Sequence, residues 1–244
     1  MKSISYLLSL LLVTTLSSCR TSYNTAKNAN PIPGDATTIT LPVSEGIKNN
    51  YRNFEKLGYQ KGAKVPDLTL YSPEGEKFTL SDVLAKNKPI LLISGSYTCD
   101  ISRHNLANIN ALTAKYTDKI STYIVYTIDA HPMDMSSPYS QTNQISLAKE
   151  NVREHIEAKQ PRTYGERKAL AQKWKQQNGI LAPVLVDKPT NDFWVSFGQA
   201  PNMAYLIEPD GTVYVKQTWF KYINLDNAIK EWLNGHPKEH VSTR

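Results

Sequence analysis

A strand-like apolar run that ends in a cysteine constrains this chain more than any other feature. Residues 89–100 read Pro-Ile-Leu-Leu-Ile-Ser-Gly-Ser-Tyr-Thr-Cys-Asp, with a Gly-Ser turn before Cys99, where a helix is expected to begin. Free N–H groups and the dipole at a helix N-terminus favour a thiolate. The segment therefore predicts a reactive thiol at a strand-to-helix turn. The alternative is a small buried cysteine that only packs.

The chain opens with a leader-like segment. Lys2 precedes an apolar run over residues 4–16, which is too short to span a bilayer. The residues Leu-Ser-Ser-Cys that end at Cys19 resemble the lipobox of bacterial lipoproteins. The resemblance implies that Cys19 is acylated and holds the protein on a membrane of the bacterial cell envelope, facing the periplasm or the surface. An ordinary signal peptide cleaved nearby is the alternative.

Composition divides the chain into four regions. We expect a signal peptide over residues 1–18, a flexible tether rich in Ser, Thr, Asn, Ala and Pro over 19–45, one folded domain over 46–235 and a tail over 236–244. The net charge of +6 is scattered, with no basic run interleaved with aromatic residues, so nucleic-acid binding is not expected. If Cys19 is lipidated, one thiol remains and no internal disulfide can form.

Hydrophobic periodicity predicts alternating strands and helices from about residue 65. Short helical segments are also expected within residues 47–57 and 145–158. The order of elements is that of a thioredoxin-like α/β fold, a central mixed sheet with helices on both faces. The expected strands cover residues 68–71, 77–80, 90–93, 122–128, 183–186, 204–207 and 212–216, and the expected helices cover residues 81–85 with Ser81 as N-cap, 99–116, 163–178, 191–197 and 225–233.

Four stretches resemble the iodothyronine deiodinase family, a branch of the redoxins. Gly-Ser-Tyr-Thr-Cys at residues 95–99 is similar to the family's Gly-Ser-Cys-Thr followed by selenocysteine, which puts Cys99 at the selenocysteine position. Residues 123–131 resemble the family's strand that ends in Ala-His, and residues 160–167 resemble its Gln-His-Arg-Ser-Leu-Glu-Asp-Arg segment. Residues 184–187 and 204–211 match its C-terminal half. The likeness covers about residues 62–233.

The chain departs from the family pattern at several of these positions. Tyr97 stands where the family has a neighbouring cysteine, Asp100 where it has a proline, and Pro161 where it has a histidine near its substrate. Asp129 replaces a glutamate. Since a resolving thiol is missing at position 97, an external thiol is expected to reduce Cys99.

The resemblance assigns three residues to the chemistry. Cys99 would be the nucleophile; the helix N-terminus and Arg103 one turn on would lower its pKa, whereas Asp100 would raise it. His131 would be the acid or proton donor, at a strand end beside the strand of the nucleophile. Asp129 would orient or charge His131. The alternatives are a surface histidine in a polar loop and a solvated carboxylate at a strand end.

Further residues are candidates for a supporting role at the site. Ser96, Tyr97, Thr98 and Tyr126 would hydrogen-bond the thiolate or the substrate, or else are turn and packing residues. Arg162 would hold an anionic group, or is solvated. Pro201 resembles the cis-proline that faces the thiol in redoxins, with a trans loop proline as the alternative; Trp219 is a candidate wall for a substrate.

These observations predict a thiol-dependent oxidoreductase that dehalogenates an aromatic small molecule. A peroxiredoxin-like thiol peroxidase or disulfide reductase is one alternative, and a non-catalytic redoxin-fold binding lipoprotein is another. The expected partners are a small-molecule substrate, a thiol or thioredoxin-type electron donor, and a membrane through the N-terminal lipid. No bound cofactor is expected, and no metal, since the histidines lack ligand-like spacing.

Overall fold

The computed structural model describes residues 31–44, 47, 53–140, 142 and 144–235. Cys19, the predicted leader and the predicted tail at 236–244 lie outside these residues. The compact unit described below begins at Ile32.

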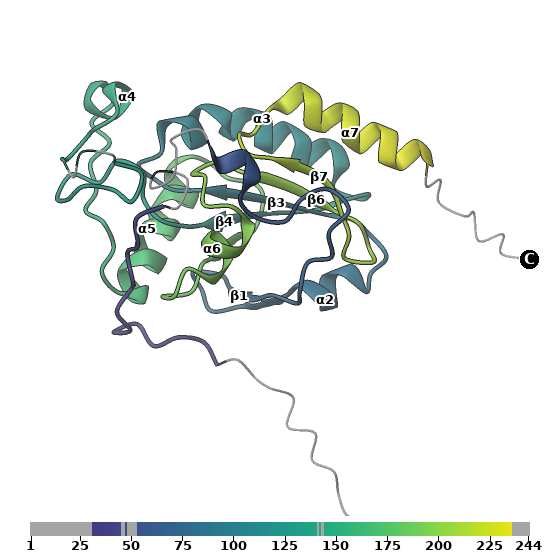
Figure 1. The fold of residues 1–244 in the computed structure, drawn as a ribbon, viewed down its shortest axis with the longest axis horizontal. Coiled ribbons are helices and arrows are strands. Elements are labelled where there is room, and N and C mark those ends of the chain that lie inside the picture. The colour runs from purple at the N-terminus through teal and green to yellow at the C-terminus, as the bar shows by residue number, and fades with distance from the viewer. Residues whose placement is uncertain (1–30, 45–46, 48–52, 141, 143, 236–244) are drawn as a thin grey trace, which may run out of the picture. The chain divides into compact units, whose positions relative to one another are not determined.

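A seven-stranded mixed sheet forms the centre of the domain (Figure 1). Its strands lie in the order β2-β1-β5-β4-β3-β6-β7. β3 pairs with β4, and β4 with β5, in parallel, whereas the other neighbours are antiparallel. The strands are β1 (Thr69–Tyr71), β2 (Lys77–Thr79), β3 (Ile90–Gly95), β4 (Ser121–Tyr126), β5 (Val184–Val186), β6 (Ala204–Ile207) and β7 (Val213–Gln217).

Two apolar clusters cover the two faces of the sheet, as the predicted thioredoxin-like fold requires. β3 is fully buried, and its side chains alternate between the clusters: Leu91 and Ile93 face one, Ile90 and Leu92 the other. The first cluster takes side chains from α3 (Asp100–Tyr116), α5 (Tyr164–Gln177) and α7 (Tyr222–Gly235). The second takes them from a 3₁₀ turn, η1 (Asn53–Lys56), and from α2 (Leu80–Leu84) and α6 (Asp192–Phe197).

The parallel strands β3 and β4 bring the segments that carry the predicted catalytic residues to the same end of the sheet. β3 and β4 run side by side over six residue pairs, from Ile90–Ser121 to Gly95–Tyr126. The segments that carry Cys99 and His131 both follow the carboxyl ends of these strands, which is where open α/β sheets place ligands.

Local capping explains where two of the helices begin. Thr163 accepts the N–H of Glu166, whose carboxylate accepts the N–H of Thr163, so the predicted capping box is confirmed. The predicted N-cap at Ser81 is wrong: α2 begins one residue earlier, after Thr79, and Ser81 instead bonds Asp67.

One helical segment is shorter than expected. The expected helix within residues 145–158 is confined to α4 (Lys149–Arg153). Such short helices depend on packing for their stability. Much of the expected helix within residues 47–57 lies outside the described residues; of the residues that are described there, Ile47 is helical and Asn53–Lys56 form η1.

The predicted tether is too long at its C-terminal end. Residues 37–40 pack on the domain: Thr38 forms a bridge with Thr163, and Ile39 is 5% exposed. The N–H of Ser44 donates to Pro138 O at 3.0 Å. The β-branched run Thr-Thr-Ile-Thr suits pairing in extended conformation, which outweighs the polar composition of the segment.

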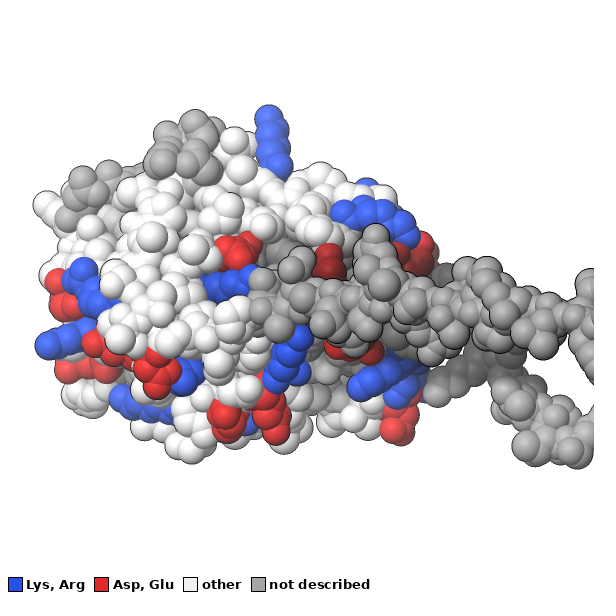
Figure 2. Space-filling view, turned by 90° about the horizontal axis from the view of Figure 1, so that it is seen from below, with Lys and Arg blue, Asp and Glu red and all other residues white. Residues whose placement is uncertain are grey.

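Charges of both signs are interspersed on the surface. Figure 2 shows lysine and arginine side chains next to aspartate and glutamate side chains on one face, with a wide uncharged area between them. Exposed pairs such as Lys64–Asp210 contribute to this pattern. In the described part of the chain, no helix has the length and apolarity to cross a bilayer.

Candidate active site

Cys99 lies at the junction of β3 and α3, as the sequence predicts. It is the N-cap residue of α3, and its Sγ accepts the N–H of Ser102 at 3.4 Å. The residue is 1% exposed, yet it lines a pocket of about 360 Å³. The thiol is therefore recessed at the wall of a cavity, in the position expected of a helix N-terminal nucleophile.

The expected depression of the Cys99 pKa is wrong. Burial is the largest influence and raises the pKa of the thiol to about 11, against the lowering effect of the hydrogen bonds from Ser102. Asp100 raises it further, and Arg103 lowers it only weakly. The guanidinium of Arg103 is committed elsewhere, since it donates to Tyr97 O at 2.9 Å and to Asn151 Oδ1 at 2.6 Å.

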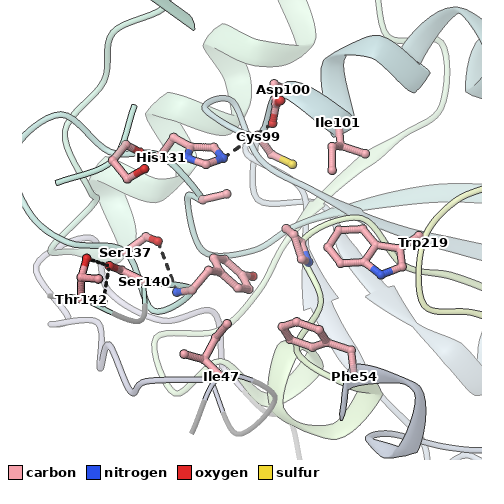
Figure 3. A pocket seen from close by; sticks show the side chains of 14 residues that line it. Ile47, Phe54, Cys99, Asp100, Ile101, His131, Ser137, Ser140, Thr142 and Trp219 are labelled. Carbon is pink, nitrogen blue, oxygen red and sulfur yellow. Dashed lines mark hydrogen bonds and ion pairs between the residues drawn. The ribbon is translucent and has the colours of Figure 1, made fainter. Parts of the chain in front are cut away.

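His131 lines the same pocket, and its ring is held at both nitrogens. Nδ1 lies 2.8 Å from Ser146 O, and Nε2 lies 3.6 Å from Asp100 Oδ1. Figure 3 shows the imidazole beside Asp100 and the Cys99 sulfur directed into the pocket. The structure thus brings Cys99 and His131 together. The side chain of His131 is 30% exposed, so protons can exchange with solvent.

Asp129 does not orient His131, contrary to expectation. Its carboxylate is fully buried and accepts hydrogen bonds from Thr98 N–H at 3.0 Å, Thr98 Oγ1 at 2.8 Å and Tyr126 Oη at 2.7 Å. Burial raises the pKa of Asp129, while these bonds oppose the rise. The carboxylate beside the imidazole is Asp100, at a position where the chain departs from the family pattern.

The buried side chains of Thr98, Asp129 and Tyr126 form a hydrogen-bonded group that fixes the backbone before Cys99. Thr98 Oγ1 also accepts the N–H of His131 at 3.1 Å, and Tyr126 Oη accepts the N–H of Tyr97 at 3.2 Å. Asn151 of α4 is buried and donates to Thr98 O at 2.8 Å. Thr98 and Tyr126 therefore position the backbone that carries Cys99 and His131, and neither lines the pocket.

The other predicted supporting residues divide between the pocket and the core. Pro201 lines the pocket, but its peptide bond is trans, because the described residues contain no cis peptide; the expectation of a cis-proline is wrong. The placement itself follows from β6, whose Ala204 pairs with Ile93 of β3. Tyr97 is buried away from the pocket, with its hydroxyl on Gln177. Ser96 is buried and lines no wall of the pocket.

Arg162 does not reach Cys99. Its guanidinium lies 3.6 Å from Asp134 Oδ2, and the residue lines a second cavity of about 400 Å³ together with Gln160 and Pro161. An anionic group bound beside Cys99 would therefore not be held by Arg162.

Sequence reasoning missed much of the pocket wall. Trp219, a candidate wall for a substrate, lines the pocket and packs edge-on against Phe54, with ring centroids 6.0 Å apart. The hydroxyl-bearing residues come from the long segment between β4 and α4, and a loop of that length is itself a sign of function. The remaining walls are Ile47, Asp100, Ile101, Ala130, Ser137, Tyr139, Ser140, Thr142 and Ser146 (Figure 3).

Comparison with known proteins assigns the chain that builds this site to a family. The sequence model described as iodothyronine deiodinase matches residues 22–235, which is most of the chain. The chain belongs to the iodothyronine deiodinase family. This deiodinase-family chain carries Cys99 at the position that the resemblance gives to selenocysteine, and the match includes every described wall of the pocket.

Other relatives support the fold of this deiodinase-family chain. It is 33% identical over 79 residues to the thioredoxin-like protein YneN of Bacillus subtilis (strain 168), a match over 32% of this chain and 45% of YneN. The chain thus spans less than half the length of that relative.

Solved structures share the fold as well. The thioredoxin domain of a thiol-disulfide oxidoreductase from Bacteroides vulgatus is similar, with a TM-score of 0.50 and 14% identity, over 72% of this chain and 100% of that one. An uncharacterized conserved protein from Geobacillus kaustophilus has a TM-score of 0.51 and 14% identity, and the match covers 73% of this chain and 85% of that one. These likenesses show a thioredoxin-like fold. Fold and family together support thiol-dependent redox activity.

Proposed function

We propose that this protein is a thiol-dependent oxidoreductase whose Cys99 attacks a halogenated aromatic molecule and removes its halogen. The observation that carries the proposal is the single pocket that the recessed Cys99 thiol and His131 line together with Phe54 and Trp219 (Figure 3). Aromatic side chains bind planar rings by edge-to-face and offset contacts, so these two residues suit an aromatic substrate.

His131 is the residue that would manage the proton. Because burial raises the pKa of Cys99 to about 11, the thiol is protonated at neutral pH and needs a base. The imidazole would take the thiol proton as the sulfur attacks the halogen. The S–halogen bond forms, the carbon–halogen bond breaks, and its electron pair goes to the carbon, which receives the proton from His131.

An external thiol would complete the cycle. Cys99 is the free cysteine among the described residues, so the chain offers no described second thiol to resolve the sulfenyl halide. Two equivalents of an external thiol would reduce it, which gives a disulfide, halide and the Cys99 thiol again. Asp100 would stabilise the imidazolium form of His131 during the reaction, because its carboxylate lies 3.6 Å from Nε2.

Membrane anchoring through Cys19 belongs to the same proposal. The lipobox-like residues before Cys19 support it, and Cys19 lies outside the described residues. A lipid at Cys19 would place the domain in the cell envelope, where thiol-based electron donors would have to reach it. Replacement of Cys19 by serine should release the protein from the membrane fraction.

Iodide release from an iodinated phenol, with dithiothreitol as reductant, tests the proposed activity. The full chain should release iodide, and the Cys99→Ser variant should fall to the rate without protein. Hydrogen peroxide and an aromatic disulfide in parallel separate the reaction classes. Peroxide consumption without iodide release would replace dehalogenation by a peroxidase, and an inert Cys99 with all three would leave a binding protein.

A further inference from the structure

Tyr139 lines the Cys99 pocket and carries a hydroxyl group that the proposed reaction does not use. The residue lines the pocket together with Cys99 and His131. It lies in the long segment between β4 and α4 that also contributes Ser137 and Ser140. Its possible role depends on the hydrogen bond that its oxygen accepts and on whether its proton is free to be donated.

The phenol oxygen is fixed from the side of α6. Trp194 Nε1 donates a hydrogen bond of 2.6 Å to Tyr139 Oη, and the two rings pack edge-on with centroids 6.0 Å apart. Trp194 is fully buried, and its backbone N–H donates to Asp187 Oδ2 at 2.9 Å. The loop is also tied by the bond from Ser44 to Pro138 O. Tyr139 is therefore preorganised before any substrate binds.

The proton of this hydroxyl is left to donate. A tyrosine hydroxyl has one O–H, and among the described residues the Tyr139 hydroxyl accepts the bond from Trp194 but finds no acceptor for its own proton. A hydroxyl that accepts a strong hydrogen bond is polarised and becomes a better donor.

Electrostatics keep that proton in place. Burial raises the pKa of Tyr139, and the bond from Trp194 opposes the rise; the charge of Asp129, and that of Cys99 once it is ionised, add to the rise. Tyr139 is therefore protonated at neutral pH.

We propose that Tyr139 is a further catalytic residue, whose O–H donates a hydrogen bond to the substrate atom that becomes negative when Cys99 attacks. This rests on the proposed function. In general form, the thiol and a substrate R–X give Cys99–S–X and R–H: the S–X bond forms, the R–X bond breaks, and the electron pair goes to R. The Cys99 proton reaches R through His131, and Tyr139 stabilises the charge on R until then.

Single-turnover reactions of Cys99 with three reagents test this role. Hydrogen peroxide expels hydroxide, which needs charge stabilisation; peroxyacetic acid expels acetate and iodoacetamide expels iodide, and both leave readily. The rates are followed by the mass of the Cys99 peptide in the full chain, its Tyr139→Phe variant and a Tyr116→Phe control. Tyr116 is also buried and loses one hydrogen bond of 2.6 Å, to Asp226, outside the pocket.

The proposal predicts a loss that depends on the leaving group. Tyr139→Phe should slow oxidation by hydrogen peroxide roughly 100-fold, the effect of removing one donor at a developing charge, and leave the other two rates within about twofold. Tyr116→Phe should change none of the three. A second variant, Trp194→Phe, leaves the phenol but removes the N–H that fixes it, and should slow the peroxide reaction by an intermediate factor.

Three outcomes would overturn the role of Tyr139. Equal slowing with all three reagents would indicate a purely structural residue. Unchanged rates in Tyr139→Phe, beside a wild type that reacts normally, would remove Tyr139 alone and leave the proposed function standing. If wild-type Cys99 reacts with iodoacetamide but with neither peroxide nor an iodinated phenol, the proposed function fails together with the role of Tyr139.

Discussion

Replacement of Cys99 by alanine should change how the stability of the domain depends on pH. Burial raises the pKa of Cys99 from 9.0 to about 11, so above pH 9 the unfolded chain loses this proton before the folded chain does. The unfolded state then binds fewer protons, and the free energy of unfolding falls as the pH rises. The stabilisation from the protonated thiol is complete below pH 9 and is lost as the pH rises through about 11.

The size of the stability loss follows from the shift in the pKa of Cys99. Two pKa units correspond to about 2.7 kcal/mol once the pH is above both values, and the loss already amounts to about 1.4 kcal/mol at pH 10. Other titrating groups, Cys19 included, occur in both proteins and cancel in the difference. We expect urea unfolding to show that the free energy of unfolding of the wild type, relative to that of Cys99→Ala, falls by about 1.3 kcal/mol between pH 8 and pH 10.

A companion assay measures the same property chemically. With the pKa at about 11, about one Cys99 in a thousand is a thiolate at pH 8, so iodoacetamide should alkylate it about 100-fold more slowly than a thiol of ordinary pKa. The alkylation rate should still rise between pH 9 and 10.5. A midpoint below pH 8.5, or a stability difference independent of pH, would refute the argument that burial controls this thiol.

Three further changes have predictable results. His131→Ala should lower turnover of an iodinated phenol roughly 10²- to 10⁴-fold and leave alkylation of Cys99 at pH 10 unchanged; unaltered turnover would remove His131 from the mechanism. Trp219→Ala should raise KM for the iodinated phenol about tenfold with a smaller effect on kcat, whereas an unchanged KM would show that the aromatic wall does not bind substrate. Asp187→Ala should lower the free energy of unfolding by about 3 kcal/mol, measured in urea, because Asp187 is buried and accepts the N–H groups of Lys188, Phe193 and Trp194; a loss below about 1 kcal/mol would contradict this.

The sequence contained the fold because its strands and helices have strong periodicity. The buried run at 90–93 became β3, and the capping box at Thr163 opened α5. The strand-to-helix turn at Cys99 and the Ala-His after β4 predicted that the two residues would meet, since both follow neighbouring parallel strands. These are local patterns or consequences of topology, which a sequence can show.

Properties set by burial and by loop packing could not be predicted in the same way. The expected thiolate at Cys99 rested on the helix N-terminus and on Arg103, but the depth of the thiol outweighs both. Asp100 rather than Asp129 meets His131, because Asp129 points into the core toward Thr98. Such choices depend on side-chain direction at the end of a strand, where one residue of register changes the face.

Tyr139 illustrates the remaining gap. It lies in a polar segment with no hydrophobic periodicity, so nothing local marks it as part of a pocket. Its position depends on Trp194, 55 residues further along the chain. A search for long segments without secondary structure would have selected the region but not the residue.

The mass of the Cys99 peptide after treatment with an iodinated phenol or hydrogen peroxide tests the central claim most directly. The account predicts an oxidised Cys99, as sulfenyl iodide or sulfenic acid or as the mixed disulfide trapped by an added thiol, and a return to the free thiol with excess reductant. The adduct should form in the wild type and be missing in Cys99→Ser. Turnover of either compound by a protein whose Cys99 stays unmodified, or by the Cys99→Ser variant, would contradict it.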